Sequence, residues 1–235
     1  MKTTLVVPSL NEIEGLKKFM PQIKREWVDQ IIILDGQSTD GTVSWAKSQG
    51  YGTFTQLKRG MWNAYTELFR SGKVKGDIVI TFSPDGNSIP EAVPVLKSII
   101  EYGYDMVIAS RYLGDAKSYD DTFLTGIGNH LLTELVNVRG KFKYTDALVM
   151  YRAYRTSIIE RLGFLESPNS LQQDLIKASN LYSWEPSLSI RAARAGLRIA
   201  EIPASEPKAN RPRRQSTFIH GGMILAQILY EEVIR

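Results

Sequence analysis

The sequence contains no cysteine among its 235 residues, so it can form no disulfide and offers no thiol nucleophile or zinc–thiolate site. His130 and His220 are the only histidines, which argues against a metal site built from several imidazoles. No apolar run of about 18 residues occurs, so no transmembrane helix is expected. Pro8, Glu12 and Glu14 follow too soon after the first residues for a secretory signal. A soluble, cytoplasmic protein is therefore expected.

The composition indicates a folded protein with a mild positive charge. Hydrophobic residues make up 43% and charged residues 23%, which excludes bulk disorder. Neither an internal repeat nor a linker is evident, so residues 1–235 are expected to form a single domain. The 29 Lys and Arg residues against 25 Asp and Glu residues give a net charge of +4. This excess fits an anionic ligand or surface and does not indicate a nucleic-acid partner.

Short apolar runs alternate with helical patterns in the first half of the chain. Strands are expected at residues 4–7, 30–34, 52–57, 77–82 and 105–109, with helices at 12–22, 42–48, 60–70 and 90–102. This alternation predicts an α/β fold with a mostly parallel sheet and helices on both faces. Ligands of such sheets bind beyond the carboxyl ends of the strands. The loops that begin at Pro8, Asp35, Ser83 and Ser110 are therefore expected to carry the chemistry.

The second half is less regular. Residues 112–128 and the basic stretch 205–217 are expected to be loops. Strands are expected at 145–153 and 197–202, and helices at 129–138, 155–162, 171–181, 187–195 and 218–235.

The first two loops combine capping residues with one carboxylate of less obvious purpose. Asn11 can cap the next helix and Glu12 favours its positive end, while Asp40 is placed to cap the helix after the second loop. Asp35 directly ends a buried strand, poised to accept hydrogen bonds from a sugar hydroxyl or a base N–H. The alternative is that Asp35 only builds a turn rich in Asp, Gly, Ser and Thr.

The third and fourth loops carry residues suited to phosphates and cations. Asp85 and Asn87 lie two residues apart just past a strand, and their oxygens suit a hard divalent cation. Because one carboxylate and one amide bind a cation weakly, such a site also needs a diphosphate. Arg111 follows another strand end and can pair with phosphate or carboxylate.

These loops resemble, in order and spacing, the motifs of the family 2 glycosyltransferases with a GT-A fold, most closely the dolichol-phosphate mannosyltransferase-like group. Within residues 3–115 the matching positions are Pro8, Asn11 and Glu12, Asp35 to Thr42, Arg59 to Ala64, Ser83 to Asp85, Pro90-Glu91, and Ala109 to Tyr112. Asp146 ahead of Val149 to Arg152, and Arg211 to Ser216, match more weakly. Gly36 and Ser83 stand where the family has an Asp, and Gln37 and Arg214 stand where it has a Gly.

The resemblance implies an inverting transfer of a sugar from a UDP- or GDP-type donor, assisted by Mg²⁺ or Mn²⁺ on Asp85 and Asn87. Residues 1–115 would bind this nucleotide-diphosphate sugar, and residues 116–235 would bind the acceptor. The nucleotide-sugar-binding residues that it implies are Pro8, Asn11, Glu12, Asp35, Arg59, Asp85, Arg111, Arg211, Arg214 and Ser216.

The role of a base depends on the acceptor. A hydroxyl acceptor needs a general base, and the candidates are Asp146 and Asp174, with Glu185 a weaker third. Trp184, next to Glu185, is a candidate for stacking on a sugar. The polyprenyl phosphates that the family often uses are already ionised, so Asp146 would then orient the acceptor or assist the metal. This acceptor class, with the basic segment 208–214, predicts peripheral contact with the inner face of a membrane.

Two other readings stay open. A sugar-nucleotidyltransferase would need a Gly-rich loop with Arg and Lys directly after the first strand, which this sequence lacks. A non-catalytic module that binds a nucleotide sugar is favoured by the departures at Gly36, Ser83 and Arg214. A Rossmann dehydrogenase is disfavoured, because no Gly-x-Gly-x-x-Gly follows a strand.

Overall fold

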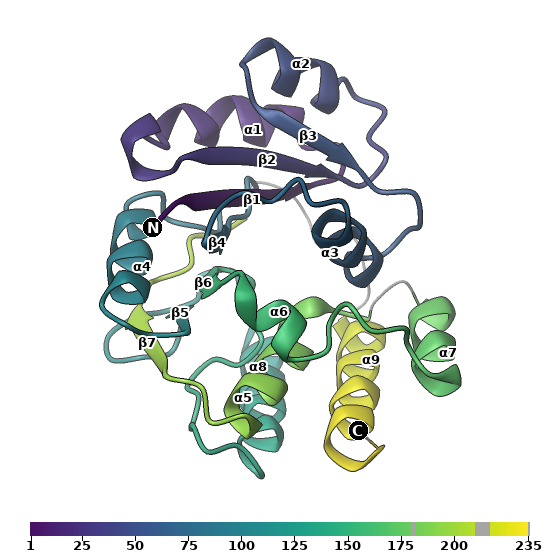
Figure 1. Ribbon diagram of the computed structural model, residues 1–235. Coiled ribbons are helices and arrows are strands. Elements are labelled where there is room, and N and C mark those ends of the chain that lie inside the picture. Colours follow the sequence, from purple (N-terminus) through teal and green to yellow (C-terminus); the bar gives the residue numbers. More distant parts are fainter. Residues whose placement is uncertain (180–181, 210–216, 235) are drawn as a thin grey trace.

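The computed structural model describes residues 1–179, 182–209 and 217–234 (Figure 1). Within them one sheet has the strand order β3-β2-β1-β4-β6-β5-β7. Its strands are parallel except β6, which runs antiparallel to both neighbours, so the expected mostly parallel sheet is confirmed. The strands are β1 (Thr3–Ser9), β2 (Gln30–Asp35), β3 (Gly52–Thr55), β4 (Ile78–Thr81), β5 (Met106–Ser110), β6 (Arg152–Arg155) and β7 (Ile199–Pro203).

Helices cover both faces of the sheet, as the alternation predicted. Side chains of β1 alternate between two apolar layers, Val6 facing one and Leu5 and Val7 the other. The layer at Val6 includes α3, α8 and α9, and the opposite layer includes α1, α2 and α4. The helices are α1 (Ile13–Phe19), α2 (Thr42–Ser48), α3 (Met61–Arg70), α4 (Ala92–Glu101), α5 (Phe123–Asn137), α6 (Ser157–Arg161), α7 (Ser170–Ser179), α8 (Trp184–Arg194) and α9 (Thr217–Leu229), with short turns η1 (Met20–Gln22), η2 (Arg25–Trp27) and the π-helix η3 (Tyr230–Ile234).

The strand expected at 145–153 is wrong in its position. The structure has β6 at Arg152–Arg155, and the residues before it form an irregular turn. The backbone amides of Thr145 and Asp146 donate to the Glu201 carboxylate at 2.9–3.0 Å. Because these amides bond to a side chain, they are not available to a strand ladder.

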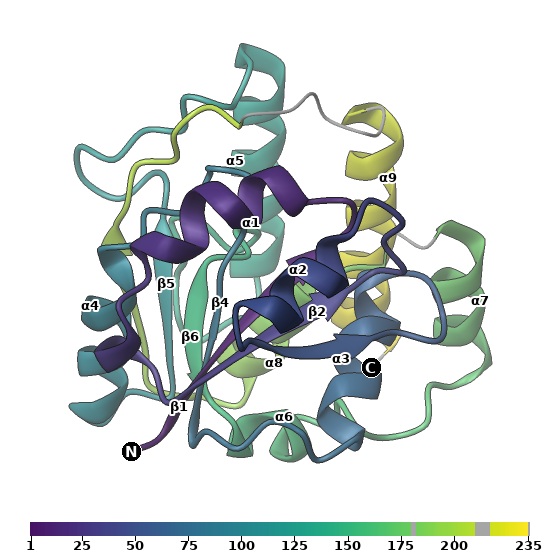
Figure 2. The ribbon, with the colours of Figure 1, turned by 90° about the horizontal axis from the view of Figure 1, so that it is seen from above.

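The helix α5 begins six residues earlier than expected, at Phe123 instead of 129. Thr122 accepts a hydrogen bond from the Thr125 amide, and the Thr125 hydroxyl accepts one from the Thr122 amide. This reciprocal capping starts the helix inside the segment expected to be a loop. The closing helix α9 packs against both α5 and α8 (Figure 2). None of the helices in the described residues combines the length and the apolar character needed to cross a membrane.

Candidate functional site

Three loops leave the sheet next to one another, because β1 lies between β2 and β4 and all three strands are parallel. Ser9, the last residue of β1, pairs in register with Asp35, the last residue of β2. The amide of Gly36 donates to the Ser9 carbonyl at 2.7 Å, which continues the pairing into the loops. The first two candidate loops are therefore in direct contact.

Asn11 and Asp40 fasten these two loops together. The Asn11 side-chain oxygen accepts from the Thr39 amide at 2.8 Å, so Asn11 does not cap α1 as expected. Asp40 takes that place, accepting from the Ile13 amide at 3.1 Å. It also accepts from the amide of Thr42, the first residue of α2, at 3.0 Å, although the N-cap position of that helix is held by Gly41. Although burial opposes it, hydrogen bonds from the Thr42 hydroxyl and from these two backbone amides lower the pKa of Asp40.

Asp35 is buried at the tip of β2, with 1% of its surface exposed. Its two oxygens accept hydrogen bonds from the amides of Gln37, at 3.2 Å, and Ser38, at 3.1 Å. Gln37 has a φ of 70°, a left-handed conformation that explains why a glycine suits this position. The carboxylate thus shapes its own loop.

The third loop presents Asp85 and Asn87 in one turn. The backbone amide of Asn87 donates to the Asp85 carboxylate at 3.2 Å. The Asn87 side-chain oxygen is buried and has no hydrogen-bond partner within the described residues. Gly15 of α1 lets this loop approach the first one, since an added Cβ would lie 2.2 Å from the Pro84 carbonyl oxygen. The first three loops therefore form one packed unit.

Arg111, directly after β5, is held by two carboxylates. Asp146 accepts from its Nε at 2.6 Å and from its Nη2 at 2.9 Å, and Glu206 lies 3.5 Å from its Nη1. Burial alone would lower the pKa of Arg111, but the Asp146 carboxylate outweighs it and raises that pKa. Burial raises the pKa of Glu206, although Arg111 and Ser118 oppose this shift. The guanidinium is therefore charged and fixed.

Buried polar groups fix Asp146 in turn. Asp146 has no exposed surface, and Glu201 binds its backbone amide from β7. Arg152, also fully buried, donates from Nη2 to the carbonyls of Ala147 and Val149 in the same turn. The expected base Asp146 thus lies behind Arg111, where it can orient the guanidinium.

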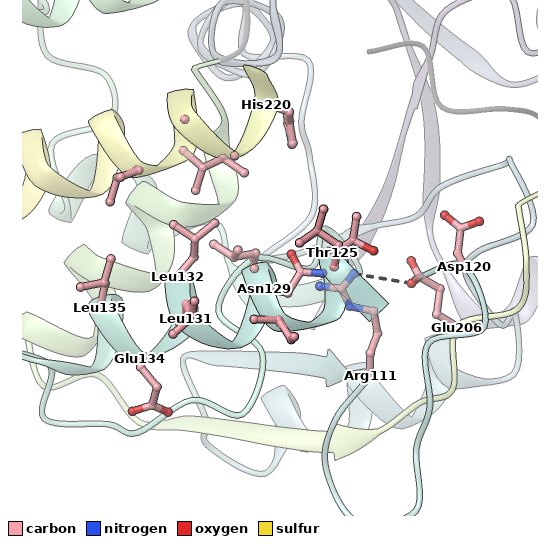
Figure 3. A pocket seen from close by; sticks show the side chains of 18 of the residues that line it. Arg111, Asp120, Thr125, Asn129, Leu131, Leu132, Glu134, Leu135, Glu206 and His220 are labelled. Carbon is pink, nitrogen blue, oxygen red and sulfur yellow. Dashed lines mark hydrogen bonds and ion pairs between the residues drawn. The ribbon is translucent and has the colours of Figure 1, made fainter. Parts of the chain in front are cut away.

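Two cavities meet at this set of residues. The smaller, of about 200 Å³, is lined by the third loop, the turn 149–151 and the segment 204–206. The larger, of about 1200 Å³, extends between α5 and α9 (Figure 3). The residues that line both cavities are Asp85, Asn87, Arg111 and Glu206. We call these four residues the junction.

The larger cavity is an apolar groove with a polar end. Figure 3 shows Arg111, Thr125 and Asn129 at that end, with Glu206 facing Arg111. Farther along α5 the wall consists of leucine side chains with Glu134 among them, and α9 supplies Ile224 and Leu225 across from them. An arrangement of this kind can bind an amphiphile whose polar head reaches the junction.

Some expected site residues lie elsewhere. Asp174 is exposed on α7 and Arg59 is exposed before α3, and neither lines either cavity. The structure brings Pro8, Asn11, Glu12 and Asp35 together in the first two loops. The expected residues Arg211, Arg214 and Ser216 lie outside the described residues.

The suggestion that Trp184 stacks on a sugar is wrong. Trp184 has no exposed surface and stacks on Tyr65 and Phe69 in the core. Its neighbour Glu185 is 7% exposed and lines neither cavity, so the structure does not bring this weaker candidate base to the junction. Desolvation raises the pKa of Glu185, with Arg152 opposing the shift.

Sequence reasoning missed Asp120, Glu206 and the groove face of α5. Glu206 is positioned by a bridge in which the Tyr119 amide donates to the Glu206 carbonyl at 2.8 Å. No local sequence pattern predicts such a contact, because the two segments are far apart in the chain. The face of α5 that lines the groove could have been predicted, because Thr122 and Thr125 form a capping pair directly before an apolar run of helical period.

Comparisons with known proteins agree with the fold. The model of a family described as Glycosyl transferase family 2 matches residues 4–163, more than half of the chain. The Undecaprenyl-phosphate mannosyltransferase of Micrococcus luteus is 25% identical, covering 86% of this chain and 82% of its own. An uncharacterized protein of Methanocaldococcus jannaschii is 27% identical over 97% of this chain and 91% of its own.

A solved structure is similar in fold. The glucosyl-3-phosphoglycerate synthase of Mycobacterium tuberculosis, crystallised with Mn²⁺, UDP and glucosyl-3-phosphoglycerate, matches with a TM-score of 0.66. The match covers 98% of this chain and 79% of that one, at 20% sequence identity. Such a likeness supports the fold expected from the motifs.

Proposed function

Because the chain belongs to glycosyl transferase family 2 and is a glycosyltransferase, we propose that it transfers a sugar from a nucleotide-diphosphate sugar to a polyprenyl phosphate. The choice of acceptor is supported by the groove of about 1200 Å³, whose apolar walls lead to charged residues at the junction. A phosphate at the end of a hydrocarbon chain matches this change from apolar to polar surface. The similarity to an undecaprenyl-phosphate mannosyltransferase supports the same acceptor class.

The donor would occupy the loops at the ends of β1, β2 and β4. Asp35 would accept a hydrogen bond from the nucleoside, and Pro8, Asn11 and Glu12 would line its place. The smaller cavity would hold the diphosphate and sugar beside the junction. Residues 1–115 would thus bind a UDP- or GDP-type donor, and residues 116–235, which include α5 and α9, would bind the acceptor.

A divalent cation fits the third loop in part. Groups of three or more His, Asp or Glu side chains able to hold a metal are absent from the described residues. The buried Asn87 oxygen without a partner and the Asp85 carboxylate supply two ligands in one turn. Mg²⁺ and Mn²⁺ commonly take their other ligands from phosphate and water. The cation would supply positive charge that stabilises the leaving diphosphate.

The transfer would be a single displacement. An acceptor phosphate oxygen attacks the anomeric carbon, while the bond from that carbon to the donor's β-phosphate oxygen breaks. The electron pair of that bond leaves with the nucleoside diphosphate, and the configuration at the carbon inverts. Because the attacking phosphate is already ionised, no proton has to be removed and no base is needed.

Arg111 would bind the acceptor phosphate. Two of its N–H groups bind Asp146 and a third faces Glu206, and a guanidinium has five, so two remain for a phosphate at the junction. Asp146 would act as a positioning residue that holds Arg111 in this orientation. This role is compatible with the absence of exposed surface on Asp146.

A transfer assay tests the proposal. Radiolabelled UDP- and GDP-sugars are supplied with Mn²⁺ or Mg²⁺ and either a short-chain polyprenyl phosphate or 3-phosphoglycerate. We expect labelled lipid with one donor, and loss of product when the metal is chelated. Transfer only to the soluble phosphate ester would overturn the lipid acceptor. Thermal shifts identify the donor base, since a ligand at 100 times its Kd adds about 2.7 kcal/mol to the free energy of unfolding.

A further inference from the structure

Three glycines line the groove from the interiors of its two helices. Gly128 belongs to α5, and Gly221 and Gly222 belong to α9. None of the three has a positive φ, so their backbone does not require glycine. A Cβ added to any of them would meet no atom of the described residues within 4 Å. Neither backbone conformation nor packing therefore explains these glycines.

Glycine inside a helix lowers the stability of that helix, and the structure shows no local reason for glycine at these positions. Glycine weakens a helix relative to alanine, because the unfolded chain loses more freedom when glycine is ordered. Yet at these positions alanine would fit without a clash. Gly126 of α5 shares this lack of local constraint, but Gly128, Gly221 and Gly222 differ from it in lining one cavity from two facing helices. This shared position indicates that the open space itself is used.

We infer that Gly128, Gly221 and Gly222 set the width of the groove for a methyl-branched isoprenoid chain and so determine acceptor specificity. This inference rests on the proposed function. Every isoprene unit carries a methyl branch, so the chain is broader at intervals than a straight alkyl chain. Side chains at the three positions would occupy the space that these branches need.

The course of the groove fits such a chain. Its lining residues on α5 run from Leu124 and Thr125, near the junction, to Val138 just past the end of the helix. At 1.5 Å per residue this stretch measures about 20 Å, which is long enough for several isoprene units. A phosphate at Arg111 would place the first units beside Gly128, with α9 opposite.

Alanine substitutions separate this role from a structural one. Gly128→Ala and Gly221→Ala narrow the groove, and Gly126→Ala is the matched control. Gly126 also lies in α5 and its added Cβ also meets open space, but it does not line the groove. We expect all three variants to unfold at a higher temperature than the unaltered protein, because alanine favours the helix.

Only the two groove variants should change acceptor use. We expect Gly128→Ala and Gly221→Ala to raise KM for an isoprenyl phosphate several-fold, with KM for the nucleotide sugar unchanged. Their preference for the isoprenyl phosphate over a saturated straight-chain alkyl phosphate of equal carbon number should also fall. A fluorescent isoprenyl phosphate gives the same comparison as direct binding, without turnover.

Three outcomes would overturn the inference. Groove variants that match Gly126→Ala in KM and in chain preference would show that the width is not used. Groove variants that unfold at a lower temperature than the unaltered protein would show that the glycines serve packing. In both cases, transfer to isoprenyl phosphate by the unaltered protein would leave the proposed function intact. If that protein neither binds nor glycosylates any lipid phosphate, the proposed function falls and the inference with it.

Discussion

A single guanidinium, that of Arg111, shows how the junction depends on charges placed behind it. The Asp146 carboxylate binds two of its nitrogen atoms and has no exposed surface of its own. Removing one partner of a buried ion pair leaves the other charge desolvated and uncompensated. The contribution of Asp146 should therefore appear in stability as well as in activity.

We predict that Asp146→Ala lowers the free energy of unfolding by about 3–5 kcal/mol, the usual cost of breaking a buried pair. Asp146→Asn should lower the free energy of unfolding by less, because the amide oxygen of asparagine can still accept a hydrogen bond from Arg111. Urea unfolding at neutral pH measures both values. Asp115→Ala, an exposed carboxylate in the loop before α5, is the control and should change stability by less than about 0.5 kcal/mol. Equal stability of the Asp146 and Asp115 variants would contradict a structural role for the pair.

Asp85 gives a second prediction at the residue scale. Asp85→Ala should weaken binding of a nucleotide-diphosphate sugar in the presence of Mn²⁺ by at least about tenfold, or about 1.4 kcal/mol. The reason is that Asn87 alone would hold the cation poorly. Calorimetric titrations with Mn²⁺ and with chelator separate the metal-dependent part. If the variant binds and turns over the donor as the unaltered protein does, Asp85 is not a metal ligand.

At the scale of elements, α5 depends on its first turn. The Thr122 hydroxyl accepts from the Thr125 amide at 3.2 Å, and α5 then forms one wall of the groove. We predict that Thr122→Ala destabilises the protein by about 1 kcal/mol, the usual cost of losing such a cap. Hydrogen exchange should quicken first in the amides of residues 123–126. Thr122→Ser keeps the hydroxyl and should behave almost as the native residue, and equal loss in both variants would exclude the cap as the cause.

The elements that sequence reasoning placed well are those with strong local patterns. The strand β2 carries three consecutive isoleucines, and its expected range 30–34 differs from the observed Gln30–Asp35 by one residue. The turn before β6 was missed because its amides bond to Glu201, a residue about 55 positions away in the chain. Local propensity carries no information about such a partner.

The same distinction holds for the site in the whole molecule. The loops were predictable, because parallel strands bring their carboxyl ends to one edge of the sheet, and Asp35 and Asp85 stand directly at those ends. The burial of Asp146 was not predictable, since it follows from Arg152, Glu201 and Arg111 closing around it. The groove likewise exists only because α9 returns to pack against α5.

The surface around the groove leads to a prediction for the whole molecule. Large apolar side chains are exposed on both helices, among them Phe123 at 88%, Ile219 at 63% and Leu229 at 50%. The apolar side chains of α9 are only partly buried, with Ile224 and Ile228 in the core. Exposed apolar side chains on the two helices of the groove favour contact with a membrane, and an acceptor held in a bilayer would have to enter the groove from there.

We predict weak, peripheral binding to anionic liposomes that high salt reduces. Each basic residue near an anionic leaflet adds about 1 kcal/mol at most, and salt screens it. Phe123→Asp should lower the sedimented fraction further at either salt concentration, because it removes apolar contact and adds a negative charge. Leu57→Asp is the matched control, since Leu57 is 83% exposed but lies between β3 and α3, outside both cavities. If the unaltered protein does not sediment with anionic liposomes at low salt, a water-soluble acceptor becomes the better explanation of the junction.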